Sequence, residues 1–293
     1  MPIKHSGLDR FIIVMNAIFL TLAVLIVVLP LTYVVIASFM DPSVLLSKGL
    51  SFHLSDWSLE GYKKILSNPA MIRGFGNAVL YSVSFAILTV VISICAGYAL
   101  SDDRLKGKSF FMTLFIITMF FGGGLIPTYL LVKNLGLLDT IWAVIIPGAV
   151  SVWNIILSRT FFKGVPNELK DAANVDGASE MRIFTSIVLP LSKPIIFVLA
   201  LYAFVGQWNS YFDAMIYLDN PNLHPLQLVL RSILIQNQVD PGMISDQLAM
   251  AEMKRLSEII KYAAIVVSSL PLIIMYPFFQ KYFEKGVMVG SLK

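Results

Sequence analysis

The chain has 293 residues, of which 57% are hydrophobic and only 14% are charged, and its formal net charge is +4. A mean hydropathy of +0.78 is more than the core of a soluble domain of this length can bury, so the composition places the chain in a lipid bilayer. The positive excess is spread over turns that flank apolar runs, as membrane topology requires, and therefore gives no reason to expect a nucleic-acid partner.

Six windows without a charged residue follow one another along the chain, and each is at least 19 residues long. Because an α-helix rises about 1.5 Å per residue, about 20 residues are enough to cross the hydrocarbon core of a bilayer. The sequence therefore predicts an all-α membrane protein with a single domain over residues 1–293. Its six transmembrane helices are expected at about residues 11–40, 74–101, 109–132, 140–158, 194–216 and 262–280.

The first apolar run follows Lys4 and Arg10 and could be mistaken for a secretory signal. Its 30 uncharged residues exceed the apolar core of a signal peptide, so we expect an uncleaved first helix. Pro30 lies two-thirds of the way along it and is expected to kink it.

Two segments are expected outside the membrane and are long enough to have structure, residues 41–73 and 219–261. Trp57 in the first suits the membrane interface, and prolines divide the second into short pieces, the last of which (245–261) is expected to be helical. These segments could cap the helix bundle or dock a substrate-delivery protein, and the residues alone favour the cap.

Three successive glycines, Gly122 to Gly124, are followed by Pro127 and interrupt the helical pattern of the third span. Glycine in a membrane helix permits either a bend or the close approach of a neighbouring helix. Of the two, we predict close packing.

A charged loop, residues 159–193, separates the fourth and fifth spans. It begins with a short helix-forming piece, Glu168 to Ala173, and Gly177 supplies a permissive backbone for the turn that follows. A second amphipathic piece is expected after the turn. The apolar residues that should share its face are Met181, Phe184, Ile187 and Val188.

Polar residues inside a span are costly in lipid and are expected to face the bundle interior or a wet cavity. The fifth span is richest in them, and its helical spacing would put Asn209 and Asp213 on one face, with Trp208 and Tyr211 on a neighbouring face. Aromatic rings stack on the C–H faces of a sugar while amides and carboxylates bind its hydroxyls, but the same residues also suit an interfacial aromatic belt and helix–helix hydrogen bonds. The candidates for a substrate pathway are Gln207, Trp208, Asn209, Tyr211 and Asp213, with Trp153, Asn154 and Tyr129 as weaker members.

Lys and Arg accumulate in short cytoplasmic loops, and their distribution therefore indicates the orientation of the chain in the membrane. With the N-terminus inside, 13 of the 22 Lys and Arg residues fall in cytoplasmic segments. Lys133 lies in the short external loop after the third span, and the other external Lys and Arg belong to long segments or their edges, which the rule discounts. Six spans then place both termini, and the charged loop, in the cytoplasm.

Motifs for catalysis are incomplete. Gly107-Lys108-Ser109 matches the end of a phosphate-binding loop, but Asp102 stands where the first glycine is required, and a carboxylate there would repel phosphate. The three histidines have no helix-spaced partners, so no metal site is expected, and the single Cys95 cannot form a disulfide within the chain. The chain is therefore predicted to be no enzyme, with no catalytic residue and no cofactor of its own.

The charged loop resembles the EAA loop of ABC-importer permeases. The matching residues are Asp171-Ala172-Ala173, Asp176-Gly177-Ala178, Phe184, Ile187 and Leu189-Pro190. Asp171 departs from the pattern, because the family usually has Glu at that place. The stretches that resemble the carbohydrate-uptake group, related to maltose-type permeases, are Gln207-Trp208-Asn209, Pro225 to Leu228 and the tail Phe283 to Ser291.

This resemblance implies a type I ABC importer permease fold in a bacterial plasma membrane, with a second permease as heterodimer partner, ATPase subunits that bind ATP and Mg, and an extracytoplasmic solute-binding protein. It further implies that the charged loop transmits movement of the ATPases to the spans. The residues that would couple to the ATPase are Glu168, Asp171, Ala172, Ala173, Asp176, Gly177, Ala178 and Phe184.

Other functions stay open at this point. The EAA-like loop is shared by permeases for many solutes, so an importer of an amino acid, phosphate or metal is the first alternative to a sugar importer. A secondary transporter would need ion-coupling groups near the midplane, usually in paired repeats, and the sequence shows no repeat. A membrane scaffold that assembles without an ATPase is a further alternative.

Overall fold

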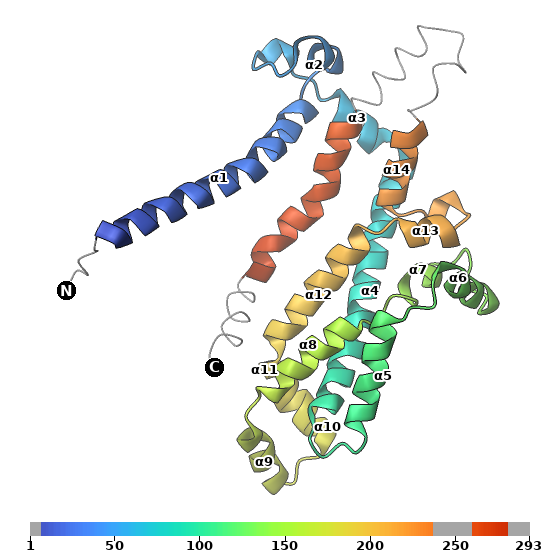
Figure 1. Cartoon of the computed structure of the whole chain (residues 1–293). Coiled ribbons are helices and arrows are strands. Elements are labelled where there is room, and N and C mark those ends of the chain that lie inside the picture. Colours follow the sequence, from blue (N-terminus) through green and yellow to red (C-terminus); the bar gives the residue numbers. More distant parts are fainter. Residues whose placement is uncertain (1–6, 237–259, 281–293) are drawn as a thin grey trace. The chain divides into compact units, whose positions relative to one another are not determined.

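The computed structural model describes residues 7–236 and 260–280 (Figure 1). Their regular structure is helical, and the one β-bridge among them joins Met40 to Trp57. Three helices are each long and apolar enough to cross a membrane: α1 (Gly7–Ser38), α4 (Pro69–Ser101) and the helix Ile260–Gln280. Two bent helix pairs pass the same test, so these residues provide three spans, or up to five if each bent pair forms one. A helical membrane protein is confirmed, and the number six stays a prediction.

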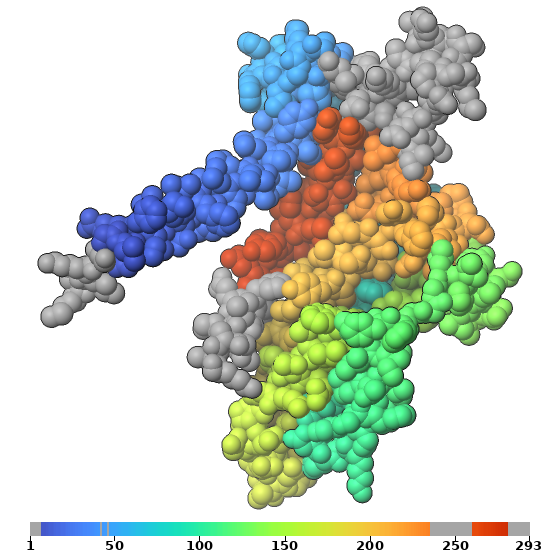
Figure 2. Space-filling view, viewed as in Figure 1, coloured from blue at the N-terminus to red at the C-terminus, as the bar shows by residue number. Residues whose placement is uncertain are grey.

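The chain divides into two compact units, the first of which comprises Met1–Asn68 and Ile233–Ser269. Its apolar helix α1 continues through Pro30 without interruption, and its side chains are exposed along the helix (Figure 2), as a lipid-facing helix requires. The short elements after it are α2 (Pro42–Lys48), a 3-10 turn (Leu54–Asp56) and α3 (Glu60–Ser67).

Aromatic contacts hold this short-helix segment together. The Phe39 ring lies 6.0 Å from Trp57 and 5.0 Å from Tyr62, centroid to centroid. The Ser38 hydroxyl is 2.7 Å from the Tyr62 hydroxyl, and the Asp41 carboxylate caps α2 by accepting the Ser43 N–H at 2.8 Å. The segment after the first helix is therefore ordered, as expected, whereas most of the predicted helix over 245–261 lies outside the described residues.

The second unit, Pro69–Ser232 and Leu270–Lys293, is built on α4, which packs along α8 (Val152–Lys163) and α12 (Lys193–Trp208). At Gly97 the backbones of α4 and α8 come close together. A Cβ atom at Gly97 would lie 2.4 Å from the Ser158 Cβ and 2.9 Å from the Arg159 N. The two helix backbones meet here because neither presents a large side chain.

Two predicted spans differ from the structure in their regularity. The fourth, expected over 140–158, consists of a short helix α7 (Trp142–Ile145) and α8, which starts only after Pro147 and Gly148 and extends to Lys163. The fifth ends as a helix at Trp208, and α13 (Phe212–Tyr217) follows as a separate element.

The three glycines of the third span produce a bend, and our prediction of close packing there is wrong. They separate α5 (Lys108–Phe120) from α6 (Leu125–Asn134), which are inclined by 112°. A Cβ atom built on Gly122 or Gly124 would meet nothing within 4 Å, and Gly124 has a φ of +84°. The bend needs a backbone that only glycine adopts readily, whereas none of the helices in residues 7–236 and 260–280 comes close to Gly122 or Gly124.

At its Pro69 end, α4 holds the segment between α13 and α14 (Leu226–Gln236) through three side chains one turn apart. Arg73 contacts the Asn222 side chain, Asn77 donates to the Asn222 and His224 carbonyls at 2.8 and 3.1 Å, and the Tyr81 hydroxyl donates to the Leu223 carbonyl at 2.8 Å. The short 3-10 turn Pro221–Leu223 is thereby fixed to the end of α4.

Candidate functional site

The first part of the charged loop is a helix, α9 (Asn167–Val175), that ends in a tight glycine turn. Gly177 has a φ of +76°, the Ala178 N–H donates to the Ala173 carbonyl at 3.0 Å, and the Gly177 N–H donates to the Asn174 carbonyl at 3.0 Å. This pair of bonds is a Schellman motif, in which a left-handed residue satisfies the last helical carbonyls. The Asp176-Gly177-Ala178 stretch therefore has this conformation because it terminates α9.

Burial divides the residues of α9 into two sets. Ala173 is buried and, with Ala178 and Phe184, packs on the cluster that includes Ile94, Phe162 and Leu199. Glu168, Asp171, Ala172, Asp176 and Gly177 are exposed. Val175 is 88% exposed and leaves an apolar side chain on the exposed surface of α9, which also carries the three carboxylates.

The second part of the charged loop has a different buried face from the one predicted. It runs through α10 (Glu180–Ile183), a π-helical turn (Phe184–Val188) and α11 (Leu189–Leu191). Ile183 and Val188 are almost fully buried, whereas Met181 is 69% exposed, so Met181 does not share the packed face of Phe184, Ile187 and Val188. The regular 3.6-residue period fails here because Pro190 lacks an N–H and the turn before it widens.

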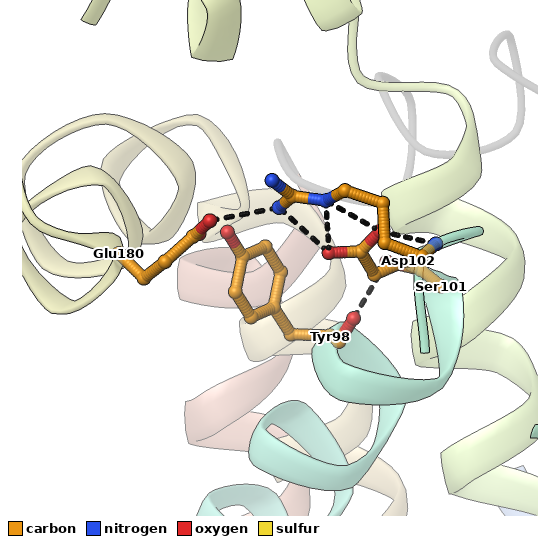
Figure 3. Close-up of polar contacts among 5 residues, drawn as sticks. Tyr98, Ser101, Asp102 and Glu180 are labelled. Carbon is orange, nitrogen blue, oxygen red and sulfur yellow. Dashed lines mark hydrogen bonds and ion pairs between the residues drawn. The ribbon is translucent and has the colours of Figure 1, made fainter. Parts of the chain in front are cut away.

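Residues at the Ser101 end of α4 contact both parts of the charged loop. The Tyr98 ring lies 4.7 Å from Phe184 and 5.5 Å from Phe162, and the Lys170 ammonium is 5.4 Å from its centroid. Figure 3 shows Asp102 and Glu180 on either side of one guanidinium, that of Arg104, whose Nη2 is 2.8 Å from Asp102 Oδ2 and 2.7 Å from Glu180 Oε1.

The charges of this cluster stabilise one another. Hydrogen bonds from the Arg104 side chain lower the pKa of Asp102, and the two carboxylates raise the pKa of Arg104. Residues 102–108 alone did not predict this cluster, because Glu180 is 76 positions from Arg104. Only the alternation of acid and base directly after an apolar span could have drawn attention to it.

A polar pocket of about 350 Å³ lies among α4, α8 and α12. Two of the predicted pathway residues, Asn154 and Gln207, line it together, from different helices. The pocket residues that the sequence analysis missed are Phe85, Thr89, Gly148, Ser151, Tyr202, Ala203, Gly206 and Ser210. Thr89 is buried, and its hydroxyl has no hydrogen-bond partner among the described residues.

The other predicted pathway residues lie elsewhere. Trp208 is 1% exposed and packs on Phe75 and Phe204, with ring centroids at 5.5 and 5.9 Å. Trp153 lines a separate pocket of about 530 Å³ with Phe115 and Met119. Tyr129 stacks on Tyr217 at 6.3 Å, and the Arg231 guanidinium lies 5.3 Å from the Tyr211 ring centroid.

The shared face of Asn209 and Asp213 that we predicted is absent, because α12 ends at Trp208. The Asn209 amide instead donates to the Val205 carbonyl at 2.9 Å and closes the last turn of α12. Asp213 starts the next helix, α13, in its first turn.

Apolar helices that border an open pocket with uncharged lining residues, together with a structured charged loop at the Ser101 end of α4, are the features expected of a membrane transport permease. The chain belongs to the family of binding-protein-dependent transport system inner membrane components, whose model matches residues 105–289. This membership makes the chain an inner-membrane transport subunit, not a catalyst, and implies an ATPase and a substrate-binding protein as partners. It confirms the resemblance drawn from the charged loop.

Relatives and a solved structure agree with this family. The chain is 37% identical to protein LplC of Bacillus subtilis (strain 168), over 99% of this chain and 97% of that protein. It is 39% identical to the polygalacturonan/rhamnogalacturonan transport system permease protein YtcP of the same organism, over 94% of this chain and 96% of that protein. A crystal structure of a bacterial ABC transporter involved in the import of the acidic polysaccharide alginate contains a chain that superposes with a TM-score of 0.84 at 30% identity, covering 95% of this chain and 99% of that one. The fold is thus that of a type I ABC permease.

Proposed function

We propose that the chain is one of two permease subunits of an ATP-driven importer that carries a saccharide across the bacterial plasma membrane. The observation that supports a saccharide is the lining of the polar pocket: its ten residues offer hydroxyls, two amides and aromatic rings, and none carries a full charge. Hydroxyl-rich, uncharged groups match such a lining, whereas phosphate, amino acid or metal ions would need charged partners. The printed names of a relative and of a structural neighbour, a polygalacturonan/rhamnogalacturonan permease and an importer of the acidic polysaccharide alginate, also indicate a saccharide, although both of those saccharides carry carboxylates.

The proposed arrangement has six spans, with both termini and the charged loop in the cytoplasm. There α9 would seat in a groove of a partner ATPase that binds ATP and Mg. Its exposed surface supplies the carboxylates of Glu168, Asp171 and Asp176 and the apolar Val175, so the groove should offer basic residues around an apolar socket. Closure of the ATP-bound ATPases would then displace α9 and shift the helices around the pocket, as alternating access requires.

Purification of the chain from detergent-solubilised native membranes tests this assembly. Mass spectrometry of the retained proteins should find an ATPase, a second permease and a solute-binding protein. The binding protein can then be screened for the saccharide that it retains. A chain that emerges alone, or only with itself, would overturn the importer assignment and favour an autonomous transporter or a scaffold.

Leucine at Gln207 or Asn154 is expected to weaken transport through the polar pocket. Each substitution removes hydrogen-bonding groups worth about 1 kcal/mol to a bound sugar, which corresponds to about a fivefold rise in the substrate concentration for half-maximal uptake. The measurement is uptake by proteoliposomes that contain the complete importer, with the saccharide identified above. Asn134→Leu, the same change at the exposed end of α6, is the control and should leave uptake unchanged. Unaltered uptake by both pocket variants would exclude this pocket from the pathway.

A further inference from the structure

The Arg104 side chain, in the turn after α4, reaches the middle of the charged loop, in addition to the Tyr98 contacts with Phe184 and Lys170 and the hydrogen bond from Arg159 Nε to the Leu100 carbonyl at 3.1 Å. Arg104 forms two hydrogen bonds from its Nε to the Asp102 carboxylate, at 3.1 and 3.2 Å, while its Nη2 reaches both Asp102 and Glu180. The Asp102 carboxylate also accepts the backbone N–H of Arg104 at 2.8 Å, which fixes the turn from which the guanidinium extends. Asp102 therefore orients Arg104, and Arg104 holds Glu180.

Glu180 is well placed to control the loop. It is the first residue of α10 and follows directly on the Schellman turn and the N-cap Ser179, whose Oγ accepts the Arg182 N–H at 3.4 Å. Holding Glu180 thus fixes the point at which α9 and α10 join. Lys170, above the Tyr98 ring, gives α4 a second contact with α9 itself.

The ion pair between Arg104 and Glu180, called the tie below, is too exposed to matter much for the stability of the fold. The Arg104 and Glu180 side chains are 68% and 59% exposed. Ion pairs so accessible to water contribute little to the free energy of folding. The tie can nevertheless set the position of one element against another, because the planar guanidinium contacts both carboxylates at once, which a lysine ammonium cannot match in geometry.

We propose that Arg104 is a positioning residue for transport: it fastens the α9–α10 turn to the end of α4, so that α4 moves with the charged loop when the ATPase displaces α9. This inference rests on the proposed coupling role of the charged loop. It adds α4, the helix that also lines the polar pocket through Phe85 and Thr89, to the elements that the loop drives directly.

The first test compares variants in the reconstituted importer, with saccharide uptake and ATP hydrolysis measured on the same vesicles. Arg104→Ala and Glu180→Ala should each lower the amount of saccharide carried per ATP hydrolysed several-fold, while ATP hydrolysis continues. Arg104→Lys should give a ratio between these and the unaltered protein. The double variant, with both alanines, should have a ratio no lower than that of either single variant. Lys108→Ala is the matched control, because its ion pair to Asp103 stays within the same turn. An unchanged ratio for Arg104→Ala, or additive losses in the double variant, overturns the proposal.

The second test restores the tie covalently. In a Cys95→Ser background, which removes the one native cysteine, Arg104→Cys and Glu180→Cys are joined by a short bismaleimide. Before reaction this variant should carry several-fold less saccharide per ATP, and after reaction it should recover most of the loss, because α4 and the loop are expected to move as one. Loss of the remaining transport on cross-linking, or no recovery, shows that the two elements must separate or that the tie is irrelevant. Failure of the importer assignment is distinct, since the chain would then not assemble with an ATPase.

Discussion

Replacing Gly97 with leucine is expected to destabilise the permease strongly and to abolish transport. The first added carbon would lie 2.4 Å from the Ser158 Cβ and 2.9 Å from the Arg159 backbone N, and a helix backbone cannot move aside as a flexible side chain can. α4 and α8 would have to separate, at a cost of about 3 kcal/mol or more for overpacking of this kind. The shift should reach the polar pocket, which both helices line.

Thermal unfolding of the purified complex and saccharide uptake measure this effect. Gly76→Leu is the control, because Gly76 is exposed on the same helix and a Cβ there meets nothing within 4 Å. The control should unfold at the temperature of the unaltered protein. Equal stability of the Gly97→Leu and Gly76→Leu variants would show that α4 and α8 do not approach as closely as the structure indicates.

Tryptophan at Gly177 is expected to leave the chain in the membrane and to reduce saccharide uptake at least tenfold. A Cβ at Gly177 meets nothing within 4 Å among the described residues, so a large side chain there is expected to collide with whatever covers α9. If that is the ATPase groove, the bulk would hold α9 out of it. The measurement is uptake at matched membrane levels, together with retention of the ATPase during purification.

The backbone at Gly177 requires its own control. With a φ of +76°, any residue with a side chain is strained there by about 1–2 kcal/mol, and asparagine is among the residues that tolerate this conformation best. Gly177→Asn should therefore retain most of the uptake. Equal losses for the two variants would assign the effect to the Schellman turn, and normal uptake by Gly177→Trp would contradict the coupling role of the charged loop.

Local patterns in the sequence were enough for the features that depend on neighbouring residues. The apolar composition and long uncharged runs indicate membrane helices because an unpaired backbone cannot cross lipid, and α1, α4 and Ile260–Gln280 follow from that. The helix over Glu168 to Ala173 and the turn at Gly177 also depend on adjacent residues, and both are present. The matching spacing in the charged loop identified the family for the same reason.

The predictions that were wrong concern places where a helix ends, bends or changes its period. We expected a continuous fifth span and so placed Asn209 and Asp213 on one face, but α12 ends at Trp208. The Gly122–Gly124 stretch permits a bend or close packing equally well, and the choice depends on whether another helix approaches. Met181 fits the amphipathic pattern and is exposed, because the π-helical turn changes the period after it.

The sequence by itself therefore determined that this protein lies in a lipid bilayer, that it is helical, which residues form its charged loop, and the family to which it belongs. These properties depend on composition and on residues close together in the chain. Only the tertiary structure decided which polar residues share a pocket, that Trp208 is a packing residue, and that Arg104 joins Asp102 to Glu180. Those relations connect residues tens of positions apart. They follow from how α4, α8, α12 and the charged loop pack together, which no local period or spacing encodes.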